Sequence, residues 1–159
     1  MKQTFLAIIV ALGATFANGQ VELKGIKLGE KGNNEVTVTT LGGVPGIIMA
    51  SNLNDSTTYQ LVFVPTNDGE NIDRISKTQT ERLKNGMEIT FGIKLRKMQV
   101  NRYSDDWYSR VEKDGVTYVF RVEVNEFMDL PNKVTIGIYN DRLYKINKKE
   151  EQQKANSDF

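Results

Sequence analysis

Carboxylates, aromatic rings and cationic side chains are the groups of this chain that could do chemistry, because its 159 residues include no His and no Cys. Their absence excludes the usual zinc sites, thiol nucleophiles, Ser-His-Asp triads and histidine pH switches. It also excludes a disulfide framework. We therefore expect no cofactor and no metal, and any catalysis would have to rest on carboxylates alone.

Two pairs of carboxylates are candidates for such catalysis. Asp105 and Asp106 precede Trp107, where a carboxylate could hold a cation or lie near a sugar ring. Adjacent strand residues point to opposite faces, so a polar turn entering a strand is the simpler interpretation. Glu81 and Glu88 share one helical face, as a glycosidase pair would, but solvated helix carboxylates are more common. We expect no enzyme, with a carboxylate-dependent cell-wall or polysaccharide hydrolase as the alternative.

Two loop motifs fail as ligand sites. Residues 67–70 resemble part of a calcium loop, but Val64 stands where the EF-hand pattern requires an acid. Residues 41–46 are glycine-rich but lack the Gly-Lys-Ser/Thr ending of a phosphate loop, so a tight turn explains them. Residues 54–56 form an N-glycosylation sequon, which matters only in a eukaryotic host.

The strongest recognition signal is the segment 101–110, which combines the single Trp of the chain with two Tyr and two Arg. These residue types are enriched in binding hot spots. Part of the segment must pack in the core, because Trp is usually mostly buried, and packing alone is the competing interpretation. Two apolar residues in the loop 125–132 extend the candidate patch for a protein or a glycan. The candidate binding residues are Arg102, Tyr103, Trp107, Tyr108, Arg110, Phe127 and Met128.

The first 19 residues have the layout of a secretory signal peptide. Lys2 precedes an apolar run at 5–12, and Ala17 and Gly19 occupy the small-residue positions for cleavage before Gln20. Cleavage after Ala17 is the second choice. The run is shorter than the roughly 20 apolar residues of a membrane span, and a chain without cysteine has no lipobox. We expect a soluble mature chain without a membrane anchor, periplasmic or secreted.

The charge balance argues against two classes of partner. The chain has 21 basic and 20 acidic residues, and removal of Lys2 with the signal leaves 20 of each. Nucleic-acid binders and polybasic membrane binders need a basic excess. Neither function is expected.

Hydrophobic alternation predicts strands in the first half of the chain. Val36 and Val38 share one face of such a strand, with Thr37 and Thr39 on the other. Pro65 is expected to break the sheet. The predicted strands are residues 21–28, 35–41, 44–50 and 58–64.

A helix is predicted to follow, beginning near Asn71 after the capping residues 67–71. Its apolar face would hold Ile72, Ile75, Leu83 and Met87. The segment 87–95 has two interpretations, because its alternating apolar residues fit a strand. The same segment fits a longer helix with Gly92 as C-cap and Ile93 folding back, which we favour slightly.

The last third begins with the clearest signal, a hairpin of residues 107–113 and 116–124 joined by Asp114-Gly115. A further strand is expected at 133–140. After it, Leu143 and Ile146 can dock one helical turn.

These elements predict an α+β fold, an antiparallel sheet of hairpins with one main helix packed on a face and a short charged C-terminal helix. The expected organisation is a cleaved signal at 1–19, one domain at 20–147 and a charged flexible tail or fraying helix at 148–159. The predicted function is an exported, non-enzymatic module that binds a protein partner, as inhibitor, immunity or adaptor proteins do. An envelope-maintenance domain without a tight partner is a further alternative.

Overall fold

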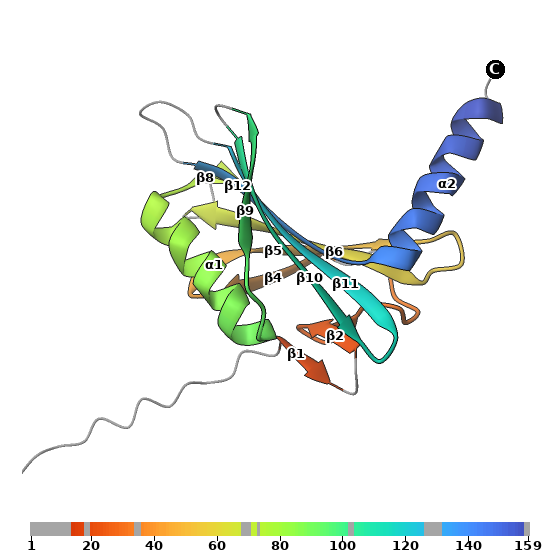
Figure 1. Ribbon diagram of the computed structural model, residues 1–159, viewed down its shortest axis with the longest axis horizontal. Helices are drawn as coiled ribbons and strands as arrows, with labels where there is room; N and C mark the ends of the chain where they lie inside the picture. Colours follow the sequence, from red (N-terminus) through yellow and green to blue (C-terminus); the bar gives the residue numbers. More distant parts are fainter. Residues whose placement is uncertain are drawn as a thin grey trace, which may run out of the picture.

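The structure is a computed structural model that describes residues 14–17, 20–33, 36–67, 71–72, 74–101, 104–125 and 132–157. It contains a large antiparallel sheet, a small one and two helices, which confirms the predicted α+β class (Figure 1). In chain order the elements are β1 (Ala14–Ala17), β2 (Gln20–Leu23), β3 (Ile26–Lys27), β4 (Val36–Leu41), β5 (Val44–Asn52), β6 (Thr58–Asn67), β7 (Asn71–Ile72), β8 (Arg74–Ile75), α1 (Lys77–Phe91), β9 (Arg96–Asn101), β10 (Ser104–Lys113), β11 (Val116–Asn125), β12 (Asn132–Asn140) and α2 (Asp141–Ser157).

The large sheet has the strand order β4-β5-β6-β12-β11-β10-β9, with short β7 and β8 beside β6 and β12. Each pairing between neighbours is antiparallel. β4 and β9 therefore end the sheet on its two sides. A separate three-stranded sheet has the order β1-β2-β3.

The core lies on one face of the large sheet, because every second residue of its central strands is apolar and points that way. Phe63, Phe120 and Ile136 lie on this face and are almost completely buried. α1 lies against the same face, and its Phe91 ring is 4.9 Å from that of Phe120. Val21, Leu23 and Leu28, from the β2–β3 segment, belong to the same core cluster. We call this side the core face and the opposite side the open face.

Helix α1 begins at Lys77, about six residues later than predicted, because Ser76 caps it and not a residue of 67–71. The Ser76 hydroxyl accepts a hydrogen bond from the Gln79 amide, and the Gln79 side chain accepts one from the Ser76 amide, which together form a capping box. Ile72 and Ile75 lie in β7 and β8, not on the helix. At the other end Gly92 adopts the left-handed conformation, with φ of 58°. The longer-helix interpretation is confirmed up to Phe91, so the alternating residues there are not a strand.

Two strand predictions need correction, and one strand was not predicted. Pro65 lies within β6 and does not break it, because β12 pairs with β6 only over residues 60–63, so no ladder bond is required on that side of Pro65. The predicted strand 21–28 is a hairpin, since Lys24 and Gly25 have positive φ and form a turn. The sequence pattern also missed β9, which is short and rich in charge.

The hairpin predicted around Asp114-Gly115 is confirmed. Both turn residues have positive φ, 50° and 75°, as a type I′ turn requires, and Lys113 pairs with Val116. The strand predicted at 133–140 is β12.

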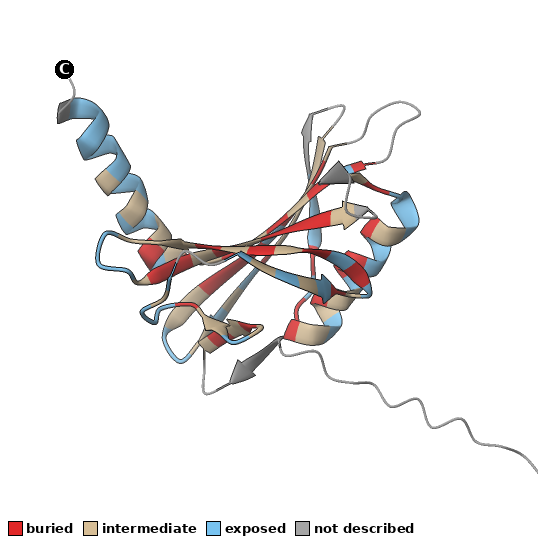
Figure 2. Ribbon diagram, turned by 180° about the vertical axis from the view of Figure 1, so that it is seen from behind, coloured by how far each residue is buried: buried red, intermediate tan, exposed pale blue. Residues whose placement is uncertain are grey.

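Helix α2 follows β12 directly and is capped by Asn140, whose side-chain oxygen accepts a hydrogen bond from the Leu143 amide. Leu143 is buried as expected, but Ile146 is 39% exposed. Beyond its first turns α2 projects from the sheet and is exposed (Figure 2). Asn54 of the β5–β6 turn contacts it through Glu150 and Lys154. Among the described residues, no helix has the length and apolar character that crossing a membrane requires.

Candidate functional site

The sheet separates the residues that the sequence grouped into one binding patch. Trp107 lies on the core face opposite Val122, whereas Tyr108 and Arg110 lie on the open face. These three residues therefore do not form one surface. Arg102, Tyr103, Phe127 and Met128 lie outside the described residues.

Trp107 of β10 contacts cationic side chains of α1 and of the neighbouring strand β9. Lys84 of α1 holds its Nζ 3.5 Å from the ring centroid, and the Lys84 side chain is only 8% exposed. Lys97 of β9 lies 6.0 Å from the same ring and pairs with Asp105 at 2.5 Å. These cation–π contacts stabilise packing within the chain. They favour the packing interpretation of Trp107.

Tyr108 and Arg110 line a hollow of about 400 Å³ where β10 extends past the end of β9. Lys94 and Arg96 also line it. Arg110 pairs with Asp141, which ties β10 to the start of α2. The hollow is cationic, but two of its three cations are paired within the chain, because Lys94 contacts Glu88 at 3.1 Å.

The candidate catalytic carboxylates form ion pairs or hydrogen bonds with neighbouring groups. Asp105 and Asp106 point to opposite faces, and Asp106 pairs with Arg121 at 2.6 Å. The amide of Leu95, aided by Lys94, holds the pKa of Glu88 below its usual range. A general acid needs a raised pKa. Every carboxyl group with a clear pKa shift in the described part of the chain is shifted downward instead. No group of three or more potential metal ligands occurs among the described residues.

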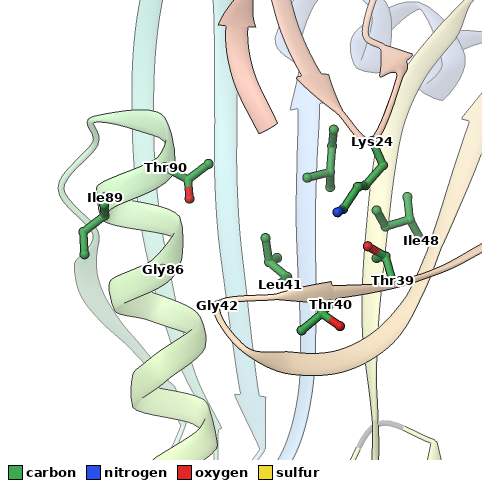
Figure 3. Close-up of a pocket in the computed structure, with 10 residues that line it drawn as sticks. Lys24, Thr39, Thr40, Leu41, Gly42, Ile48, Gly86, Ile89 and Thr90 are labelled. Carbon is green, nitrogen blue, oxygen red and sulfur yellow. The ribbon is translucent and has the colours of Figure 1, made fainter. Parts of the chain in front are cut away.

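An apolar slot of about 160 Å³ lies between α1, β4 and the β2–β3 turn (Figure 3). Its shape depends on two glycines in close contact, since a Cβ on Gly86 of α1 would lie 2.8 Å from the Cα of Gly42. Ile89 of α1 lines the slot and is 83% exposed. The lining is Leu23, Lys24, Thr39, Thr40, Leu41, Gly42, Ile48, Gly86, Ile89 and Thr90.

The most distinctive surface is apolar and lies on the open face of β4, β5 and β6. The strand registers align two rows across these strands: Val38, Ile47 and Val64 form one, and Val36, Met49 and Val62 form the other. Exposure is greatest at the edge of the sheet, where Val36 is 65% and Val38 is 83% exposed, and it falls toward β6, where Val64 is buried. We call these six residues the valine face. α1 packs against the opposite side of the sheet.

The open face also carries a group of charged side chains beside the valine face. It carries Lys133 on β12, Arg121 and Glu123 on β11, and Asp106 on β10. Arg121 forms ion pairs with Asp106 and Glu123. The valine face is therefore an apolar area with a charged flank on the same surface.

The sequence contained part of the signal for this surface. The alternation of Val36 and Val38 with threonines correctly placed the two valines on one side of a strand. Alternation does not tell which side faces the core, and in β4 it is the threonine side.

Comparisons of the chain with protein-family models, with curated proteins and with solved structures find no match.

Proposed function

We propose that this chain is an exported, non-enzymatic binding module that acts by protein–protein contact, and that the valine face is its contact surface. The observation that carries the proposal is the exposure of Val36 and Val38 at the end of two apolar rows. Contiguous apolar patches on a soluble domain are typical of interaction sites.

The composition of this surface supports a protein as the partner. Interfaces combine an apolar centre with a polar rim, as the valine face and its charged flank do. A sheet face suits a second folded surface, and an interface of about 800 Å² per partner is ordinary. The balanced charge of the chain gives no support to a nucleic acid or an anionic membrane as the partner.

Export is the second part of the proposal, and it rests on the signal-like pattern of residues 1–19. Cleavage before Gln20 would remove β1, which pairs with β2. β2 and β3 have contacts with the core that do not depend on β1. Val21 and Leu23 are buried, and the Leu28 amide donates a hydrogen bond to the Val21 carbonyl. We therefore expect the core to survive this cleavage.

The test is capture from native envelope extract with the exported protein, whose N-terminus is read by mass spectrometry and expected at Gln20. We expect the wild type to capture one protein in a stoichiometric amount. The double substitution Val36→Asp and Val38→Asp should lose it, because two charges would have to be desolvated in an apolar contact. Circular dichroism first checks that each variant is folded.

Ile89→Asp is the matched control, because Ile89 is as exposed as Val38 but lies on α1. Capture should survive this change. Trp107→Ala tests the segment that the sequence favoured, and loss of capture by this variant alone would move the site there. The proposal would be contradicted if the wild type captured no protein, or if the Val36→Asp and Val38→Asp double variant captured as much as the wild type. Either result would favour a domain without a tight partner.

A further inference from the structure

We propose that β4 also pairs, antiparallel, with β4 of a second copy of this chain, which joins two large sheets into one. β4 ends the sheet, so one side of its backbone has no strand partner in the described part of the chain. This inference goes beyond the proposed partner, because it concerns the strand edge and not the valine face.

The register identifies which backbone groups point outward. Leu41 and Val44 flank the two-residue turn Gly42-Gly43, so they form a hydrogen-bonded pair. Such pairs alternate along an antiparallel ladder, which makes Thr40 and Pro45 a pair without hydrogen bonds. Pro45 has no N–H and fits this position. The N–H and C=O groups of Val36, Val38 and Thr40 therefore point away from β5.

The side chains of β4 make the strand complementary to itself. It contains valine, threonine and leucine and has no charged residue. A two-fold axis at Val38 would place Val38 opposite its symmetry mate, Thr37 opposite Thr39, and Val36 opposite Thr40. β-branched pairs of this kind stabilise antiparallel sheets. In this register all three outward-pointing residues form hydrogen-bonded pairs.

The opposite edge of the sheet shows how such pairing is prevented. β9 begins with Arg96 and Lys97, and edge strands with cations repel a like strand. β4 lacks this protection and instead exposes two valines beside its free edge. A second copy is thus the occupant that its neutral, alternating sequence fits.

The two-fold axis would stand perpendicular to the sheet, since antiparallel pairing keeps each face on one side. The two valine faces would then meet and form one continuous apolar surface. Loss of dimerisation can be distinguished from loss of partner binding. Partner binding depends on side chains of the open face, whereas dimerisation depends on the backbone edge of β4.

Sedimentation equilibrium of the exported protein tests the proposal. We expect a monomer–dimer equilibrium between about 1 µM and 1 mM, the range of weak interfaces. Thr40→Pro removes one outward N–H from each copy and should weaken the dimer about tenfold. Thr40→Val keeps this N–H and should dimerise like the wild type. A wild type that is monomeric throughout this range, or equal effects of both variants, would overturn the proposal.

Single cysteines test the register, because the chain has none of its own. In Val38→Cys the two Cα atoms would be about 5.5 Å apart, close enough for a disulfide. In Val36→Cys they would be about 14 Å apart, too far to link. Met98→Cys, on β9, controls for random collision. Cross-linking confined to Val38→Cys is the expected result, and equal cross-linking of Met98→Cys would contradict β4 pairing.

Discussion

At the scale of single residues, Gly46 shows how closely the sheet is packed. A Cβ at this position would lie 2.4 Å from Cζ of Phe63 and 2.5 Å from the carbonyl oxygen of Val64. Gly46→Ala should therefore lower the free energy of unfolding by about 1–3 kcal/mol, the usual cost of overpacking a core. Urea unfolding measures the change. Gly137→Ala is the control, because the nearest atom to its Cβ is Gln60 Nε2 at 3.6 Å.

Gly137→Ala should change stability by less than about 0.5 kcal/mol, as a substitution with room for the added methyl does. Equal losses in the two variants would show that β propensity, and not the Phe63 contact, decides the Gly46 effect.

At the scale of elements, the start of α1 depends on its capping box. Ser76→Ala removes the acceptor of the Gln79 amide and should cost about 1 kcal/mol of stability. Ser76→Asp supplies another acceptor and should retain most of it. Thermal and urea unfolding of both variants test this. If Ser76→Asp were as unstable as Ser76→Ala, the cap would not be the cause.

At the scale of the whole molecule, the described carboxylates with shifted pKa values predict acid sensitivity. The Lys31 ammonium and the Thr57 amide lower the pKa of Asp55 from 3.8 to about 2. Since the folded pKa is the lower one, the unfolded state binds more protons, and stability falls as pH drops from about 4.5 toward 2. The pKa values of three further carboxylates are also lowered, mainly by hydrogen bonds from neighbouring groups: Glu88, Asp141 and Glu151.

The composition of the chain predicts that stability is constant above about pH 4.5. The chain has no His, so no side chain has an ordinary pKa between pH 5 and 8. Urea midpoints should be nearly constant across that range and decrease below about pH 4.5. A fall in the midpoint between pH 8 and 6 would contradict this account.

The sequence by itself determined features that depend on neighbouring residues. The Asp114-Gly115 turn, the left-handed end of α1 at Gly92 and most strands of the sheet follow from local conformational preferences. The start of α1 is also encoded locally, because Ser76 and Gln79 have the spacing of a capping box, although residues 67–71 offer capping residue types earlier in the chain.

Only the tertiary structure decided which surface is exposed. The sequence gives β4 a valine side and a threonine side, and packing against α1 and the β2–β3 segment places the threonine side toward the core. The placement of Trp107 on the face opposite Tyr108 and Arg110 also depends on the sheet, because a strand sends adjacent residues to opposite faces. Burial depends on contacts between residues far apart in the chain, so periodicity finds a face but not what covers it.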